Sequence, residues 1–391
     1  MFERVTTTSG FQALKRDWDQ LYQAAGVSNP FVSHAWLSAW SAHVARRFAA
    51  LCIRSAPGAP LDAAVMFATD HRDRWCYVTE HSYRPGLLAR PGAVHPLRAL
   101  IGYIFTHEPW VWRVGLHRCP DTDGFYRALM RELGPLRPLC VPEEVSVPER
   151  VIDVSGSFDD YLAARASKKI RQELRRKLRQ IVRRMPAVVF DELSGVSGRE
   201  ALDIITHVER DSWKVDARTA IISNQRERGF YRAVFEIEDV RTRGRMFTLS
   251  GPEGTFAYVL GVQHDDTYYA LKTSYRADHA RLAPGQALFA YLIRHMCEHE
   301  PTVATIELLG TDSRWKRELA SYTRHERGYD VMRPDPVGIS YALVRGHLRP
   351  ALKRAAVHDA RVARLIAVSK RVRAGVGSVL SRSDEHERSG N

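Results

Sequence analysis

The chain has 391 residues, of which 45% are hydrophobic, and a formal net charge of +13. This length suits two domains and a tail, and the composition excludes a disordered or fibrous protein. Two segments, 165–184 and 345–382, each carry ten Lys or Arg and one acid, so the remaining residues have a net charge of 13 − 18 = −5. A dedicated nucleic-acid-binding domain is more often basic along a whole face, so this uneven charge argues against that class.

The cysteines are dispersed and show neither CxxC nor Cys/His ligand spacing: Cys52, Cys76, Cys119, Cys140 and Cys297. Such an odd set predicts reduced thiols in a cytosol and argues against a disulfide framework and a zinc site. The N-terminal stretch MFERVTTTSG lacks the apolar core of a signal peptide, and no run of about 18 apolar residues occurs. We therefore expect a cytoplasmic protein without a metal.

Residues 1–150 predict a first α/β domain. Apolar periodicity indicates helices at 11–24, 34–48, 95–105 and 123–133. The stretches LCIRS, LDAAVMFAT and RWCYVTE predict a strand meander with SAPGAP and DHRD as its turns, and WVWRVGL predicts a further strand. Four prolines between 133 and 151 mark the crossing to a second domain.

Residues 151–345 predict a second α/β domain with the same order of a strand meander, a helix, a strand and a helix. Helices are expected at 157–185, 197–214, 226–239, 284–300 and 313–323. Strands are expected at 187–193, 244–251, 254–264, 267–275, 303–310, 325–331 and 338–344. A basic amphipathic helix to about residue 373 and a disordered end follow over 346–391.

The basic segment has one apolar stripe at helical spacing, which predicts a docked helix and excludes a disordered arm. The stripe consists of Leu162, Ala166, Ile170, Leu174, Leu178, Ile181 and Val182. The opposite, cationic face is either simply solvated or attracts an anionic partner: CoA phosphates, a nucleotide-sugar or lipid-phosphate acceptor, or a membrane surface.

The stretch TYYALKTSYRADHARLAPGQALFAYLIRHM, residues 267–296, leads from a strand into a helix that starts at Pro284. Gly285 and Ala287 are small enough for a ligand to approach the backbone closely. Because a helix N-terminus offers free N–H groups and a positive dipole end, this stretch predicts a phosphate site.

Five stretches occur in the order that is typical of the CelD-like acyltransferases, the polysaccharide-associated branch of the GNAT superfamily, which is related in fold to the FemAB-type tandem transferases. They are PFVSHAWLSAWSAHV (30–44), SKKIRQELRRKLRQI (167–181), ERDSWK (209–214), SYRADHARLAPGQALFAYLI (274–293) and LLGTDSRWKREL (308–319). The chain resembles this family over residues 2–345.

This resemblance implies two tandem GNAT-like domains, each a mixed, mostly antiparallel sheet flanked by helices, with an acyl-CoA, chiefly acetyl-CoA, as donor. It also implies that the loop before Gly285 holds the CoA pyrophosphate. The residues expected to do so are Arg281, Ala283, Gly285, Gln286 and Ala287. The family's loop pattern places Gln or Arg three positions before its first glycine, whereas this chain has Leu282 there and Arg281 one step earlier.

Acyl transfer to an amine requires a proton acceptor for the amine, N–H groups for the oxyanion and a proton for the leaving thiolate. The N–H groups are expected from a splayed strand edge around 271–275. Tyr275 is a candidate proton donor or a packing side chain, and Asp211, like Glu209, a candidate base or a surface acid. Asp312 is a candidate base or a helix N-cap.

Three aromatic or cationic side chains near these candidates are expected to bind the acceptor: Trp213, Lys214 and Trp315. A buried Trp is more often part of a core, so both interpretations stay open. Lys316 resembles the lysine that recurs after a glycine in the family pattern and is a candidate for catalysis or for holding a phosphate or carboxylate.

Three functions fit these observations. The first is an acyl-CoA-dependent N-acyltransferase acting on an amino sugar or a similar precursor of a surface polysaccharide, peripheral to the inner membrane face. The second is a FemAB-like transferase that uses aminoacyl-tRNA. The third is a non-enzymatic binder of nucleic acid or membranes; the acidic remainder disfavours nucleic acid as a partner.

Overall fold

The structure is a computed structural model that describes residues 1–78, 80–164 and 168–348. Its first part, here called the N-terminal unit, comprises the elements from β1 to β7. The strands are β1 (Phe2–Val5), β2 (Phe48–Arg54), β3 (Leu61–His71), β4 (Arg74–Tyr77), β5 (Leu88–Ala89), β6 (Arg113–Pro120) and β7 (Cys140–Pro142). The helices are α1 (Thr8–Ala13), α2 (Lys15–Ala25), α3 (His34–His43), α4 (Pro96–His107) and α5 (Asp123–Leu133).

The C-terminal unit comprises the elements from β8 to α13. Its strands are β8 (Val147–Asp153), β9 (Val189–Ser194), β10 (Gly244–Gly251), β11 (Gly254–His264), β12 (Thr267–Tyr275) and β13 (Thr305–Leu308). Its helices are α6 (Phe158–Ala163), α7 (Lys168–Arg184), α8 (Gly198–Glu209), α9 (Trp213–Asp216), α10 (Gln225–Glu236), α11 (Glu238–Arg241), α12 (Pro284–His299) and α13 (Arg314–Leu319). The strand β14 (Tyr322–Met332) and the helix α14 (Pro336–Leu343) complete the described chain.

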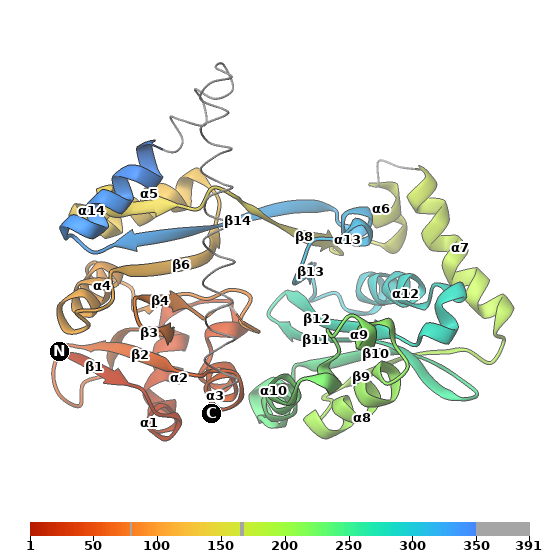
Figure 1. Cartoon of the computed structure of the whole chain (residues 1–391). Coiled ribbons are helices and arrows are strands. Elements are labelled where there is room, and N and C mark those ends of the chain that lie inside the picture. Colours follow the sequence, from red (N-terminus) through yellow and green to blue (C-terminus); the bar gives the residue numbers. More distant parts are fainter. Residues whose placement is uncertain (79, 165–167, 349–391) are drawn as a thin grey trace, which may run out of the picture.

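Among the described residues, one continuous sheet of 14 strands runs through both units, in the order β1-β2-β3-β4-β6-β14-β8-β13-β12-β11-β10-β9, with β5 on β3 and β7 on β14. The long strand β14 joins the units, because its first part pairs with β8 and its second part with β6 (Figure 1). This mixed α/β architecture confirms the predicted fold class. The domain boundaries at residues 150 and 345 stay a prediction.

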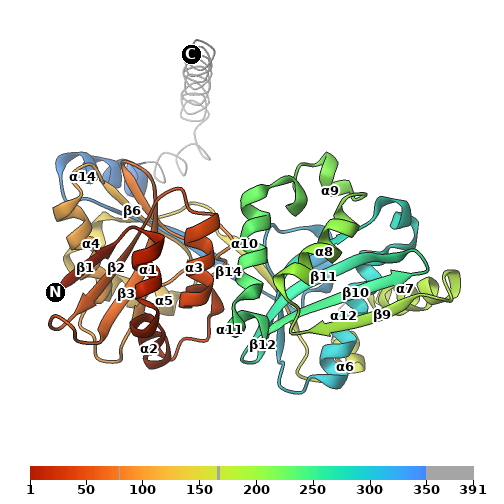
Figure 2. The ribbon, with the colours of Figure 1, turned by 90° about the horizontal axis from the view of Figure 1, so that it is seen from below.

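Helices cover both faces of the sheet. On one face, α1–α3 of the N-terminal unit and α8 and α10 of the C-terminal unit pack into a single apolar core, and α3 lies beside α10 (Figure 2). Trp36 of α3 touches Phe230 of α10 edge to face, with ring centroids 5.5 Å apart. On the other face, α4 and α5 form one core, and α6, α7 and α12 form another.

The basic helix is docked through part of its predicted apolar stripe, because Val182 is 49% exposed and the burial of Ala166 and Ile170 lies outside what the structure describes. Leu174 and Ile181 of α7 are buried in the core with α12, whereas Arg179 and Arg183 are exposed. No helix in the described ranges is long and apolar enough to cross a bilayer. The second basic helix is predicted within 346–391. The structure describes the chain only up to residue 348, so this prediction lies outside the described residues.

The expected strand at 338–344 is wrong, because Pro336–Leu343 forms the helix α14. Asp335 caps this helix by accepting a hydrogen bond from the Gly338 N–H at 2.7 Å, and Pro336 occupies its first turn. This start signal overrides the β-branched residues further along. The expected helix 34–48 is also too long, since α3 ends at His43 and β2 begins at Phe48.

Candidate active site

The sheet opens at the centre of the C-terminal unit, between β12 and β13. These parallel strands pair only from Thr267↔Thr305 to Ala270↔Leu308. Beyond that point β12 continues to Tyr275 and pairs with β11 alone. Leu271 is an extra residue in the β11–β12 register, so a bulge lies where the two strands part. The edge of β12 beyond Ala270 that faces β13 is therefore unpaired among the described strands, at the position where a splayed strand edge was expected.

The helix α12 begins beside this opening. Ala283 precedes it in a left-handed conformation, with φ 52° and ψ 51°, and no side chain caps the helix. Pro284 has no N–H, and the N–H of Gly285 has no hydrogen-bond partner among the described residues. Ala287 is buried and Gln286 is exposed. This helix start presents an unpartnered N–H and the positive end of the dipole, which suits an anion.

Tyr275 lies against this helix start, and Asp211 lies beside the loop that precedes it. A Cβ on Gly285 would sit 3.4 Å from Cδ1 of Tyr275, an ordinary van der Waals contact, so the ring packs directly against this position. The carbonyl of Asp211 accepts a hydrogen bond from the Ala277 N–H at 2.8 Å, and its exposed carboxylate lies 3.9 Å from Arg276. Arg281 is also exposed on this loop. A cavity of about 540 Å³ adjoins the loop, lined in part by Arg184, Arg276 and His279.

Asp312 and Lys316 lie on the other arm of the opening, after β13. Both carboxylate oxygens of Asp312 accept hydrogen bonds from Arg150, at 2.9 and 3.1 Å, and a third comes from Arg317 at 2.7 Å. These bonds hold the pKa of Asp312 well below its usual range, which suits a fixed anion better than a proton acceptor. Lys316 donates to the carbonyls of Leu309 and Thr311, and burial lowers its pKa to about 8.

The expected acceptor-binding residues are not brought together in one pocket. The Trp315 ring packs against Phe289 of α12, with centroids 4.8 Å apart, and so contributes to the core. Trp213 is 48% exposed at the start of α9. Lys214 is buried and donates to Glu209 at 3.2 Å.

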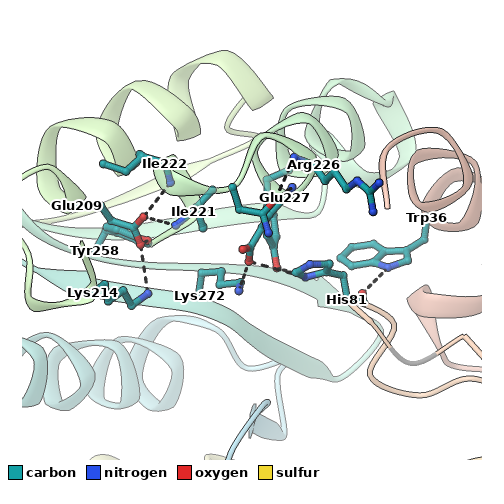
Figure 3. A network of polar contacts seen from close by, with 12 residues as sticks. Trp36, His81, Glu209, Lys214, Ile221, Ile222, Arg226, Glu227, Tyr258 and Lys272 are labelled. Carbon is teal, nitrogen blue, oxygen red and sulfur yellow. Dashed lines mark hydrogen bonds and ion pairs between the residues drawn. The ribbon is translucent and has the colours of Figure 1, made fainter. Parts of the chain in front are cut away.

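Glu209 is fully buried at the end of α8, and its carboxylate accepts four hydrogen bonds. One oxygen accepts from Lys214 and from the Tyr258 hydroxyl at 2.8 Å, and the other accepts from the Ile221 and Ile222 N–H groups (Figure 3). A carboxylate held by four donors ties α8 to the start of the loop before α10. This arrangement makes Glu209 a structural residue.

A second acidic group, which the sequence did not single out, lies at the opening itself. Lys272 of β12 forms an ion pair with Glu227 of α10, and His81 of the N-terminal unit lies 4.0 Å from the same carboxylate (Figure 3). Burial opposes the charge of Lys272, but Tyr83 and Glu227 outweigh this effect and raise its pKa. Burial lowers the pKa of His81 to about 4, so its imidazole is neutral at physiological pH.

Glu227 also lines a cavity of about 410 Å³ between the two units. Its walls are formed by Val44, Arg46, Asp70, His71, Glu80, His81, Asn224, Arg226 and Glu227. Glu227 thus lines this cavity, and its carboxylate forms the ion pair with Lys272 of β12. Lys272 is the one charged residue within the otherwise uncharged stretch TYYALKTSY, and this was the available sequence signal.

The chain is similar in fold to several solved structures. One of them is FemX, with 9% sequence identity and a TM-score of 0.55 over 84% of this chain and 98% of that chain. A conserved protein of unknown function from Bacteroides thetaiotaomicron (11% identity, TM-score 0.54, 81% and 97%) and L-PGS from Bacillus licheniformis (14%, TM-score 0.50, 80% and 92%) are also similar. At these identities the likeness concerns the fold alone. Among curated proteins, none matches the sequence.

A family match gives the chemistry of the C-terminal unit. Residues 168–317, from α7 to α13, match the family described as Acetyltransferase (GNAT) domain. The match includes the opening between β12 and β13 and the start of α12. No group of three or more His, Cys, Asp or Glu in the described ranges is placed to hold a metal ion. Residues 168–317 therefore form a GNAT acetyltransferase domain, and the prediction of a GNAT-type acyltransferase is confirmed.

Proposed function

We propose that the chain transfers an acyl group, chiefly acetyl, from acyl-CoA to an amine of an amino sugar or a related precursor of surface polysaccharide. The observation that carries the proposal is the opening between β12 and β13 directly beside the uncapped start of α12. Acyl-CoA carries its acyl group as an activated thioester. The CoA thiolate is the leaving group when the amine attacks. The remaining steps belong to residues of this chain.

The start of α12 fits the donor's pyrophosphate. The unpartnered N–H of Gly285 and the exposed guanidinium of Arg281 offer hydrogen bonds and charge to an anion. Gly285 leaves its N–H accessible, whereas Ala287 is buried with its N–H donated to the Ala283 carbonyl at 3.2 Å, and Leu282 stands where the usual loop pattern has a polar residue. We assign anion binding here to Arg281, Ala283, Gly285, Gln286 and Ala287.

The edge of β12 and Tyr275 surround the position for the thioester. The N–H groups of β12 beyond Ala270 that face β13 can donate to the oxyanion that forms during attack. We assign Tyr275, whose ring packs against Gly285, the role of giving its hydroxyl proton to the leaving thiolate. Lys316, in the segment that follows β13, adds an amino group with a pKa of about 8 near the same opening.

The cavity between the units is our proposed acceptor site. It has three acids, Asp70, Glu80 and Glu227, which favour a cationic amine, and two arginines for its polar substituents. Glu227 is the carboxylate that both lines the cavity and contacts the opening, so we assign it the role of accepting the amine proton.

Thermal melting with CoA and acetyl-CoA tests the donor site. A ligand at about 100 times its Kd stabilises the folded state by roughly 2.7 kcal/mol. Gly285→Glu places an anion where the pyrophosphate is expected and should abolish this shift. Gly124→Glu is the matched control, because Gly124 is the second residue of α5 as Gly285 is of α12, and it has open space around it. A folded wild type without any shift would contradict the donor and make salt-sensitive tRNA binding the next measurement.

Release of free CoA with glucosamine as acceptor tests the acceptor site. We expect Glu227→Gln to lower kcat by about a hundredfold while the CoA melting shift stays intact. Glu80→Gln, on the facing wall of the same cavity, should change mainly KM. Equal kcat in wild type and Glu227→Gln would remove Glu227 from proton transfer.

A further inference from the structure

The N-terminal unit has an opening of its own, at the place that corresponds to the active site of the other unit. Within the described part of the sheet, only two pairs of strands are parallel, β12 with β13 and β4 with β6. The second pair runs from Arg74↔Arg113 to Cys76↔Gly115 and then ends. Cys76 is therefore the last paired residue before the strands of the N-terminal unit separate.

A histidine and a carboxylate lie next to this cysteine. Nδ1 of His117 lies 3.2 Å from Oε1 of Glu143, and Nε2 of the same imidazole lies on the side of Cys76. A Cβ on Gly115 would lie 2.6 Å from Nε2 of His117 and 3.1 Å from Sγ of Cys76. The two atoms thus share the space that a side chain at position 115 would fill, and glycine keeps this space open.

A second glycine makes room for the carboxylate. A Cβ on Gly328 of β14 would lie 2.4 Å from the carboxyl carbon of Glu143. The backbone holds Glu143 in place, since its N–H donates to the Gly328 carbonyl at 2.7 Å and its carbonyl accepts from Arg327 at 2.8 Å. The order of thiol, imidazole and carboxylate is that of a nucleophile, its base and the group that orients the base.

The cluster is accessible and carries charge. The side chains of His117 and Glu143 are 22% and 36% exposed, and Cys76 is partly exposed. Neighbouring residues on β4 and β6 that point to the opposite face, such as Trp75 and Val114, are buried in the core with α4. The interactions of the imidazole with Cys76 and with the accepting carboxylate of Glu143 raise the pKa of His117 to about 9, so an imidazolium lies beside the sulfur at neutral pH.

We propose that Cys76, His117 and Glu143 form a second reactive site, at which Cys76 takes up an acyl group from a thioester. The sulfur of Cys76 attacks the carbonyl carbon and a new S–C bond forms. The bond between that carbon and the donor sulfur breaks, and the proton of His117 goes to the departing thiolate. The products are an acyl-Cys76 thioester and a free thiol. The choice of acyl-CoA as natural donor rests on the proposed function, whereas the nucleophilic site itself does not.

Mass spectrometry of the full chain, incubated separately with acetyl-CoA and with phenyl thioacetate, tests this site. Cys297 is the internal reference, because it is also partly exposed but burial raises the pKa of its thiol to about 11. We expect a hydroxylamine-labile acetyl group on Cys76 that forms at least tenfold faster than on Cys297. His117→Gln should remove the difference, and Glu143→Gln should reduce it severalfold.

The two thioesters separate this proposal from the proposed function. Phenyl thioacetate needs no CoA site, so acylation of Cys76 by this reagent supports the nucleophilic site even if CoA gives no melting shift. Gly285→Glu should leave that reaction unchanged. Acylation of Cys76 no faster than that of Cys297 with either thioester would overturn the proposal. An unchanged rate of Cys76 acylation in a folded His117→Gln variant would also overturn it. If that variant fails to fold, the comparison of Cys76 with Cys297 in the wild type still tests the proposal.

Discussion

Two lysines at the opening between β12 and β13 respond differently to burial. Lys272 has Glu227 as a partner, and its pKa is raised. Lys316 has two carbonyl oxygens as hydrogen-bond acceptors, and burial dominates, so its pKa falls to about 8. The difference follows from the neighbours, because a carboxylate stabilises the ammonium ion much more than a carbonyl does.

The low pKa of Lys316 predicts a pH-dependent stability. Unfolded, this lysine has a pKa near about 10.4, so between about pH 8 and 10.4 the unfolded state binds more protons than the folded state. The free energy of unfolding should therefore rise with pH in this window, by up to about 3 kcal/mol, relative to the variant Lys316→Met. Below about pH 8 the difference between the two proteins should be constant.

Urea unfolding of both proteins from pH 7 to 10.5 measures this difference. Arg314→Met, which removes a cation that is 84% exposed from the same helix α13, is the control and should show no such trend. Parallel curves for wild type and Lys316→Met would mean that the ammonium ion is better solvated than its contacts indicate.

At the scale of elements, local signals were readable from the sequence. Most of the apolar stripe of α7, the strands of the 244–275 meander and the start of α12 at Pro284 agree with their predictions, because each depends on residues close by in the sequence; Val182 of the stripe is exposed. The helix α14 lies where a strand was predicted, because Asp335 and Pro336 start a helix ahead of the β-branched residues.

The candidate site depends on contacts that no local pattern contains. Glu227 and Lys272 are 45 residues apart, and Asp312 meets Arg150 across 162 residues. The cluster of Cys76, His117 and Glu143 is equally invisible, because it forms only when β4, β6 and the segment after β7 come together. The two glycines that leave room for it, Gly115 and Gly328, gave no signal without the fold.

The helix α7 is the element most suited to an anionic membrane surface. Its apolar stripe is occupied by α12, so only the arginine face is free to bind. We expect Arg179→Gln/Arg183→Gln to weaken binding to vesicles with anionic lipids by about 2 kcal/mol, or roughly thirtyfold, since each arginine near such a surface contributes about 1 kcal/mol. Vesicle sedimentation at fixed ionic strength measures this change.

A double variant on another helix shows whether the position of the charge matters or only its amount. Arg228→Gln/Arg232→Gln alters the net charge equally, on exposed positions of α10. This protein should bind vesicles as the wild type does. Equal losses in both double variants would show that total charge alone matters, and no binding by the wild type would exclude α7 as a membrane surface.

At the scale of the whole molecule, the two units share both a strand and a core. β14 pairs with β8 through residues 322–326 and with β6 through residues 326–332. Trp36, fully buried, touches Phe230 of the other unit and donates its ring N–H to the His81 carbonyl at 2.8 Å (Figure 3). The acceptor cavity is lined from both sides of this contact, so its shape depends on how the units are joined.

Trp36→Ala should therefore destabilise both units together, by about 3–5 kcal/mol, because it removes a large buried side chain at their junction. Hydrogen exchange should accelerate alike in the β2–β3 pair and in the β10–β12 strands, as one cooperative unit requires. Trp110→Ala, at a position that is 65% exposed, should change the stability by less than about 0.5 kcal/mol. Faster exchange in the N-terminal unit alone would show that the two units unfold independently. The cavity that both units line could then change its shape while each unit stays folded.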